Sequence, residues 1–236
     1  MKYLKRAIEK LLGLLYPVKC PFCGKLWSGI CDDCREKYPV IGEPRCMKCG
    51  KPIWKETEEY CYDCKKVKHY YEWGRSLWIH KTPVNESIYA FKYKNRRCYG
   101  EIFARELAKE YGKCLKQKKV ELIIPIPLHK SRIKERGYNQ TEILAKYLGE
   151  YTGIEVDKVS LIRIKKTTPQ KCNNDKERKK NIKNAFVLKK KINVENVVLI
   201  DDIYTTGSTL DEAARILKKA GVSNVYFLTI SVGQGY

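Results

Sequence analysis

The most regularly spaced reactive groups in this chain are cysteine thiols. Eight of its 11 cysteines form four Cys-x-x-Cys pairs, all between residues 20 and 64. A gap of two residues lets both thiolates of a pair bind the same Zn²⁺ at about 2.3 Å, and a second pair completes a tetrahedron. The sequence therefore predicts two structural Zn²⁺ sites with four ligands each, which are Cys20, Cys23, Cys31, Cys34, Cys46, Cys49, Cys61 and Cys64.

Two other uses of paired cysteines fit this sequence less well. A disulfide framework requires an oxidising compartment and a secretion signal, which we do not expect in this chain. A redox Cys-x-x-Cys normally occurs once, beside a βαβ pattern, whereas here four copies follow one another. Zinc binding is therefore the favoured interpretation.

The spacing also bears on which pairs share an ion. In the simpler arrangement, the first ion is bound by the pairs at 20–23 and 31–34 and the second by the pairs at 46–49 and 61–64. A cross-braced arrangement is the alternative. Gly24 and Gly50 directly follow the second cysteine of a pair, where a zinc knuckle often needs a residue with a positive φ angle. This placement favours ribbons that begin at Cys20 and Cys46.

A second group of reactive residues follows an apolar segment near the C-terminus. Residues 197–200 are Val-Val-Leu-Ile, and Asp201 and Asp202 come directly after them. Residues 205–209 read Thr-Thr-Gly-Ser-Thr and open a predicted helix. Backbone N–H groups and hydroxyls at such a helix start form a cradle for phosphate, whereas carboxylates suit sugar hydroxyls or Mg²⁺. A phosphate next to a diol is the pattern of a ribose 5-phosphate.

Alternating strands and helices are expected to position these residues. The hydrophobic pattern predicts strands at residues 70–80, 122–126, 159–164, 197–200 and 225–230, and helices at 84–93, 102–111, 141–151 and 210–220. A further amphipathic helix at residues 2–16 is expected to dock against another part of the protein. The alternation implies an α/β fold, a parallel sheet flanked by helices, with the site at the carboxyl ends of the strands.

The composition indicates a strongly basic protein. The chain carries 48 lysine and arginine residues against 27 aspartate and glutamate residues, a formal net charge of +21. Such a charge favours anionic partners, whether polyphosphates, nucleic acids or acidic protein surfaces. No segment approaches the roughly 18 consecutive apolar residues that would span a bilayer. We therefore expect a cytoplasmic protein without membrane insertion.

Residues 197–209 resemble the phosphoribosyl pyrophosphate (PRPP) loop of type I phosphoribosyltransferases. Three other segments extend the resemblance to the ComF family of competence proteins. Residues 123–129, with Arg132 and the run Arg-Gly-Tyr-Asn-Gln at 136–140, are similar to its pyrophosphate loop. Residues 91–93, Phe-Lys-Tyr, resemble its Lys-Tyr motif, and the segment leading into Ala-Phe at 185–186 resembles its flexible loop. The chain is identified as a member of this family over about residues 20–230.

The resemblance implies a type I phosphoribosyltransferase-like fold behind a double zinc ribbon. The expected division places the N-terminal helix and the ribbons in residues 1–66. The phosphoribosyltransferase-like domain would occupy residues 67–236, with a hood or connecting region at 67–119 and a core at 120–236. Its ligand would be PRPP or a related ribose phosphate together with Mg²⁺.

The resemblance also implies a role for each loop. The 5-phosphate would be held by Thr205, Thr206, Gly207, Ser208 and Thr209. The ribose hydroxyls and the Mg²⁺ shell would be held by Asp201 and Asp202. The pyrophosphate loop would comprise Pro127, Leu128, His129, Arg132 and Arg136, with His129 equally suited to a structural hydrogen bond.

Positive side chains would neutralise the charge that develops as pyrophosphate leaves. Arginine suits this role because its planar guanidinium donates two hydrogen bonds to one phosphate. Candidates are Arg132, Arg136 and Arg178. The flexible loop would contribute Gln170, Arg178 and Asn181, and the catalytic residues would be Asp201, Asp202 and Arg178.

One departure from related enzymes bears on catalysis. Purine-salvage phosphoribosyltransferases place a carboxylate just before the Thr-Gly of this loop, where this chain has Thr205. The region in which a nucleobase hood is expected is occupied by the cysteine pairs and a short aromatic stretch. We therefore expect PRPP or ribose-phosphate binding, with turnover left open. The alternative is an active Mg²⁺-dependent phosphoribosyltransferase that acts on an amine or a nucleobase.

The family resemblance implies a role in natural competence, in which imported single-stranded DNA meets cytoplasmic proteins. Lysine and arginine side chains neutralise phosphates regardless of sequence, and aromatic rings can stack on bases. Single-stranded DNA and competence or recombination proteins are therefore expected partners. A plainer interpretation treats the zinc ribbons as a platform for protein docking.

Overall fold

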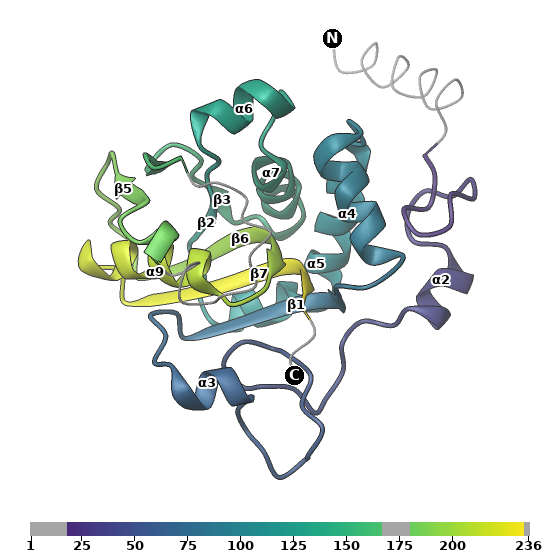
Figure 1. Cartoon of the computed structure of the whole chain (residues 1–236), viewed down its shortest axis with the longest axis horizontal. Coiled ribbons are helices and arrows are strands. Elements are labelled where there is room, and N and C mark those ends of the chain that lie inside the picture. Colours follow the sequence, from purple (N-terminus) through teal and green to yellow (C-terminus); the bar gives the residue numbers. More distant parts are fainter. Residues whose placement is uncertain (1–17, 167–179, 234–236) are drawn as a thin grey trace.

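A five-stranded parallel sheet forms the centre of the protein (Figure 1). The computed structural model describes residues 18–166 and 180–233, so the helix predicted at 2–16 lies outside the described residues. The strand order is β1-β7-β6-β2-β3, and every pair of neighbours is parallel. The strands are β1 Trp73–Ile79, β2 Leu122–Pro125, β3 Glu155–Val156, β6 Asn196–Tyr204 and β7 Asn224–Val232. This arrangement confirms the predicted α/β fold.

Helices cover both faces of the sheet (Figure 1). On one face lie α4 Val84–Tyr93, α5 Cys98–Gln117 and α7 Gln140–Thr152, and on the other lies α9 Ser208–Lys219. Side chains alternate between the two faces of a strand. Accordingly, Val198 and Ile200 of β6 join the core beneath α5 and α7, whereas Val197 and Leu199 join the core beneath α9.

The strand predicted at residues 159–164 lies outside the parallel sheet. It is present as β4 Leu161–Arg163, which pairs antiparallel with β5 Phe186–Leu188 in a separate two-stranded sheet. The edge strand next to β2 is instead β3, which has only two residues. A segment this short shows no hydrophobic period, so the sequence pattern did not reveal it.

Each cysteine-rich segment forms a small hairpin followed by a short helix. Single antiparallel bridges join Lys19 to Leu26 and Arg45 to Pro52. The helices are α2 Asp32–Lys37 and α3 Tyr62–Lys66. Gly24 and Gly50 have φ angles of +76° and +74°, which confirms the conformation predicted from their positions.

The two ribbons pack on different parts of the protein. Cys20, Cys31 and Cys34 of the first ribbon belong to the core beneath α5. There Arg35 donates two hydrogen bonds, of 2.6 and 2.5 Å, to the buried carboxylate of Glu106. Cys46 and Cys49 of the second ribbon belong to the other core. The ribbons are therefore held by both packing and polar contacts.

The second ribbon lies close against the start of β1. A Cβ atom at Gly50 would lie 2.8 Å from the carbonyl oxygen of Gly74, so the two backbones approach too closely for a side chain at Gly50. The guanidinium of Arg75 donates to the carbonyl oxygens of Cys46 and Met47, both at 3.3 Å. Within residues 18–166 and 180–233, no helix has the length and apolar character needed to cross a membrane.

Candidate functional site

The end of β6 and the turn that follows it carry the predicted phosphate and diol residues. After Tyr204, the last residue of β6, the chain reaches α9 through Gly207, whose φ angle is +74°. A Cβ atom at Gly207 would lie 2.6 Å from the hydroxyl oxygen of Tyr204, so only glycine fits. The hydroxyl oxygens of Thr206 and Ser208 lie 2.8 Å apart at the helix start. The turn therefore presents hydroxyls and backbone N–H groups together.

The side chain of Tyr204 packs against this turn. Its ring stacks on Phe227, with 5.0 Å between ring centroids and 3° between ring planes. Its hydroxyl oxygen lies 2.8 Å from the hydroxyl oxygen of Tyr71, and both side chains are buried. The ammonium group of Lys51, from the second ribbon, lies 5.8 Å from the centroid of the Tyr204 ring. The second zinc ribbon thus lies next to the residues that shape the turn.

Asp202 is buried and its two carboxylate oxygens have separate partners. One oxygen lies 2.8 Å from the ammonium group of Lys92, at the end of α4. The other accepts a hydrogen bond of 2.6 Å from the side-chain amide of Gln140. Gln140 in turn accepts a hydrogen bond from Arg136. The network joins α4, α7, β6 and the short helix α6 Lys130–Arg136 at one carboxylate.

Asp201 has a different environment. One of its carboxylate oxygens accepts a hydrogen bond of 2.9 Å from the backbone N–H of Asp202. Burial, together with the neighbouring Asp202 carboxylate, raises the pKa of Asp201 to about 7. Arg163, at the end of β4, is close enough to oppose this rise in pKa electrostatically. A carboxylate in such a place is suited to bind sugar hydroxyls or a hard cation such as Mg²⁺.

The predicted pyrophosphate loop starts beside these carboxylates. Pro125 of β2 pairs with Ile200 of β6, and the N–H of Ile126 donates to the carbonyl oxygen of Ile200 at 2.9 Å. The side chains of Asn139 and Thr141 hold the carbonyl oxygen of Ile126. Residues 127–129 therefore follow the carboxyl end of β2, at the same end of the sheet as residues 201–202.

The residues of the pyrophosphate loop have separate surroundings. The imidazole of His129 accepts a hydrogen bond from the backbone N–H of Ser131 and caps the short helix α6 Lys130–Arg136. This contact agrees with the structural role considered for His129. Arg132 and Arg136 line a cavity between α4 and α6, together with Lys92. Pro127 and Leu128 are half-buried and are not among the residues that line it.

The predicted flexible loop falls largely outside the described residues. Gln170 and Arg178 belong to that part of the chain. Asn181 is half-buried, shortly before β5. Ala185 and Phe186, where the loop was expected to end, are buried in the core beneath α9.

The cysteines form two groups of four. Within each group, all four sulfur atoms lie within 4.8 Å of one another, and the grouping is sequential along the chain. The sulfur atoms of Cys23 and Cys31 are 3.6 Å apart, as are those of Cys49 and Cys61. Tetrahedral coordination at about 2.3 Å places thiolates about 3.8 Å apart, so the spacing fits zinc. The two groups are zinc-binding sites with four cysteines each.

The sequence interpretation missed the roles of several residues in the site. Lys92 and Gln140 lie in segments that were recognised by resemblance, but no role followed from the pattern. Tyr204 gave no signal, since buried aromatic residues are common in any core. A lysine that directly follows an apolar helical face, as Lys92 does, is the one local sign that could have drawn attention.

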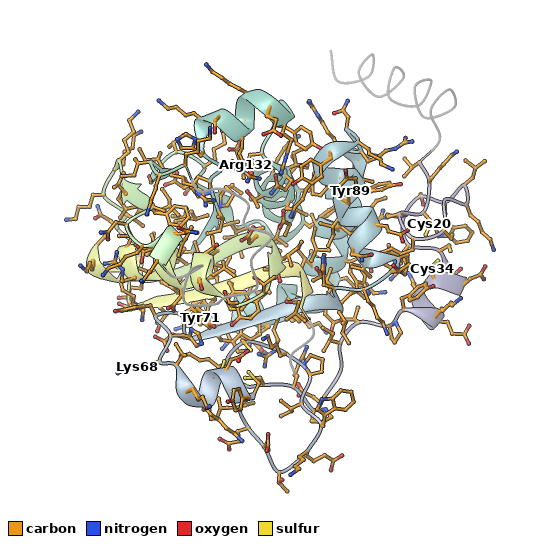
Figure 2. All side chains as sticks on the ribbon, in the orientation of Figure 1. Cys20, Cys34, Lys68, Tyr71, Tyr89 and Arg132 are labelled. Carbon is orange, nitrogen blue, oxygen red and sulfur yellow. The ribbon has the colours of Figure 1, made fainter. Side chains whose placement is uncertain are left out.

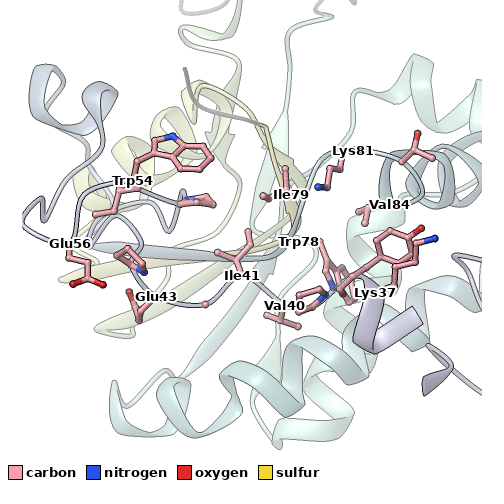
Figure 3. A pocket seen from close by; sticks show the side chains of 17 residues that line it. Lys37, Val40, Ile41, Glu43, Trp54, Glu56, Trp78, Ile79, Lys81 and Val84 are labelled. Carbon is pink, nitrogen blue, oxygen red and sulfur yellow. The ribbon is translucent and has the colours of Figure 1, made fainter. Parts of the chain in front are cut away.

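A second cavity lies apart from the predicted site. It has a volume of about 530 Å³ and is lined by the segment that joins the two ribbons and by the end of β1 (Figure 3). Ile41, Trp78 and Ile79 line its apolar part, and Trp54 stands at its edge with 92% of its surface exposed. None of the site residues predicted from the sequence contributes to this cavity.

Comparisons with known proteins agree with this arrangement. Residues 11–65 match the family described as Double zinc ribbon domain, and residues 133–231 match the family described as Phosphoribosyl transferase domain. The parallel sheet, its flanking helices and the two four-cysteine sites define a phosphoribosyltransferase-like protein with a double zinc ribbon.

Relatives that match most of the chain identify the family within this class. Competence protein F of Haemophilus influenzae is 32% identical over 84% of this chain and 88% of its own length. DNA utilization protein YhgH of Salmonella typhimurium is 27% identical over 90% of this chain and 94% of its own. Competence protein ComFC of Bacillus subtilis is 28% identical over 81% of this chain and 79% of its own. The chain belongs to the ComF family of competence proteins.

Proposed function

We propose that this protein binds PRPP or a related ribose phosphate, together with Mg²⁺, at the end of β6. The observation that carries the proposal is the position of Asp201 and Asp202 directly before a hydroxyl-rich turn that opens α9. The first N–H groups of a helix have no partner within the helix, and the helix dipole favours an anion there. Phosphate would bind at the turn and the ribose hydroxyls at the carboxylates.

The contacts of the two carboxylates support separate roles. Asp202 is held by Lys92 and Gln140, so its orientation is fixed before any ligand binds. Asp201 accepts a hydrogen bond from a backbone N–H and is the better candidate for ligand hydroxyls and the Mg²⁺ shell. Mg²⁺ would neutralise phosphate charge there. Residues 127–129 would carry the pyrophosphate, because they leave the sheet beside Asp201.

We propose that this binding serves the handling of imported single-stranded DNA in natural competence. The names of the relatives, which refer to competence and DNA utilization, support this assignment. So does the net charge of +21, because phosphate neutralisation by lysine and arginine gives affinity for nucleic acids. The protein would act in the cytoplasm, with competence or recombination proteins as partners.

An active Mg²⁺-dependent phosphoribosyltransferase is the second candidate. The developing charge on pyrophosphate would be neutralised by Mg²⁺ and by positive side chains such as Arg178. Thr205 is exposed and stands where purine-salvage enzymes have a carboxylate, so a proton acceptor would have to come from the acceptor molecule. An amine acceptor meets this condition better than a purine does.

Salt dependence separates the two kinds of ligand. Titration calorimetry of the zinc-loaded full chain should detect PRPP only with Mg²⁺, and raising salt from about 50 to 200 mM should weaken binding only a few-fold. The affinity for a single-stranded oligonucleotide should fall by orders of magnitude over the same range if several phosphates are bound. PRPP binding that needs no Mg²⁺ and falls as steeply as oligonucleotide binding would contradict a dedicated site.

A further inference from the structure

A basic cavity lies beside the Asp202 network, between the end of α4 and α6. Its volume is about 460 Å³. Its walls carry four positive side chains, Lys92, Arg97, Arg132 and Arg136, against one carboxylate, that of Glu135. The charge of Lys92 is already balanced by Asp202. The three arginines therefore determine what the cavity attracts.

These arginines have no carboxylate partner in the part of the chain that the structure describes. The arginines with ion pairs to carboxylates there include Arg35 and Arg215, which lie elsewhere in the fold. Three uncompensated guanidinium groups around one cavity favour an anion. Guanidinium geometry matches a phosphate in particular, because its planar donors pair with two oxygens at once.

Contacts within the protein hold the guanidinium groups of two of these arginines in place. The guanidinium of Arg136 lies 4.7 Å from the centroid of the Tyr93 ring and donates to the side chain of Gln140. Its Nε is buried and has no acceptor among residues 18–166 and 180–233. The guanidinium of Arg97 lies 4.5 Å from the centroid of the Tyr138 ring, and its Nε donates to Asn95 at 2.8 Å. Fixed donors lose little entropy when they bind a phosphate.

Aromatic side chains lie in the wall of this cavity and next to it. Tyr89 and Tyr93 on α4 have ring centroids 4.9 Å apart, and 55% and 52% of their surfaces are exposed. Tyr93 lines the cavity together with Arg132. Figure 2 shows Tyr89 on α4 and Arg132 on α6, which lies to the upper left of α4 in that view. Exposed rings next to phosphate-binding cations are the combination that binds nucleotides through stacking and charge.

We propose that this cavity binds one nucleoside monophosphate unit. The phosphate contacts Arg97, Arg132 and Arg136, and the base stacks on Tyr89 and Tyr93. A volume of about 460 Å³ accommodates a single nucleotide rather than a run of several. The unit is either a free nucleotide or the phosphorylated end of a single strand. This inference goes beyond the proposed ribose-phosphate site, with which the cavity shares Lys92, Arg132 and Arg136.

The test compares ligands with and without the phosphate. The probes are adenosine 5′-monophosphate, adenosine, and one short single-stranded oligonucleotide with either a 5′-phosphate or a 5′-hydroxyl end. Binding is measured by calorimetry for the full chain and for the variant Arg97→Ala/Arg132→Ala. The matched control is Lys109→Ala/Lys113→Ala on α5, which removes the same charge from exposed positions.

We expect the monophosphate to bind at least about tenfold more tightly than adenosine, and the arginine variant to lose about tenfold or more of that affinity. The lysine control should retain it within about twofold. A preference for the 5′-phosphorylated strand identifies a strand end as the source, and its absence identifies a free nucleotide. Equal binding of adenosine and the monophosphate, or an arginine variant that binds like the parent protein, would overturn the proposal.

Two further measurements separate lost ligand contacts from lost folding. Thermal unfolding should show that the arginine variant is folded, as expected because Arg97 is exposed. Replacing Tyr89 and Tyr93 by leucine should weaken the binding of the monophosphate but not the binding of inorganic phosphate. PRPP binding with Mg²⁺ should change by less than about twofold in the single variant Arg97→Ala, because Arg97 lies outside the residues assigned to the PRPP site. A parent protein that binds the monophosphate but not PRPP would contradict the ribose-phosphate site and leave this one intact.

Discussion

The ammonium group of Lys92 lies 2.8 Å from a carboxylate oxygen of Asp202. This contact joins the end of α4 to the end of β6, and only 17% and 7% of the two side chains are exposed. It places a positive charge within the candidate sugar-phosphate site and leaves Asp202 with no oxygen that lacks a partner. The orientation of the carboxylate is therefore set by the protein itself.

Removing one partner of this pair should leave a buried charge without compensation. We expect Lys92→Met to lower the free energy of unfolding by about 3 to 5 kcal/mol, measured by urea denaturation. The double variant Lys92→Met/Asp202→Asn should recover part of the loss. Lys146→Met, which breaks an exposed pair with Glu150, should cost less than about 0.5 kcal/mol. Similar losses of unfolding free energy for Lys92→Met and Lys146→Met would show that the buried pair contributes no more to stability than an exposed one.

The raised pKa of Asp201 makes stability depend on pH. Its pKa is about 7 in the folded protein against an ordinary value of 3.8, so the folded state binds the proton more tightly than the unfolded state. The contribution of this group to stability is therefore fully present below about pH 4 and is lost as the pH rises to about 7.

The variant Asp201→Asn lacks this pH dependence. Its free energy of unfolding should exceed that of the parent protein by an amount that grows from about pH 5.5 to about pH 7 and levels off above it, at about 1.4 kcal/mol per pKa unit. Both proteins contain the same zinc sites, so the difference isolates Asp201. If the free energies of unfolding of the two proteins changed with pH in the same way, ionisation of Asp201 would not destabilise the folded protein, which would contradict this prediction.

The turn before α9 should not tolerate a side chain at Gly207. Both Gly207→Ala and the control Gly153→Ala introduce alanine at a φ angle near +75°, at a cost of about 1 kcal/mol. Only the Cβ atom at Gly207 would meet the ring of Tyr204. We expect an additional loss of about 1 to 3 kcal/mol and weaker PRPP binding for Gly207→Ala alone. Equal effects of the two substitutions would contradict the packing argument.

The second zinc site should affect the phosphate turn more than the first does. Lys48 and Lys51 of the second ribbon lie over the rings of Tyr71 and Tyr204, which support the turn. Losing a ligand should unfold the ribbon, because metal binding is coupled to folding in such modules. We expect Cys46→Ser to weaken PRPP binding at least about tenfold. The variant Cys20→Ser, with an equally buried ligand, should leave PRPP binding nearly unchanged.

Zinc content provides the control for this comparison. Each variant should retain about one of its two ions by elemental analysis, since the two groups of four cysteines are separate. Equal losses of PRPP affinity in both variants would indicate a general loss of folding rather than a contact between the second ribbon and the turn.

Local patterns made much of the protein predictable. The ligands of each zinc site lie within about 20 residues of one another, so their spacing alone identifies them. Asp201, Asp202 and the turn that follows belong to one continuous segment, and the apolar run before them indicates a buried strand. Gly24 and Gly50 could be assigned their conformation because each follows a fixed position of a knuckle.

Contacts between distant segments could not be predicted in the same way. The pair of Lys92 and Asp202 joins the end of α4 to β6, and the pair of Tyr71 and Tyr204 joins the segment before β1 to the last residue of β6. Both pairs form only once these distant segments pack together. The sequence grouped Arg132 with the pyrophosphate loop, but the direction of its side chain depends on how α6 turns toward α4. Periodicity gives the face of an element and not the partner that this face meets.

The most direct test of the ribose-phosphate site is a calorimetric titration of the zinc-loaded protein with PRPP and Mg²⁺. The parent protein should bind with micromolar affinity, and Asp201→Asn/Asp202→Asn should lose at least about tenfold of it. The control Asp32→Asn/Glu36→Gln changes the charge equally at exposed positions of α2 and should bind like the parent protein. Unchanged binding in the double aspartate variant, or no binding in the parent protein, would contradict the proposed site.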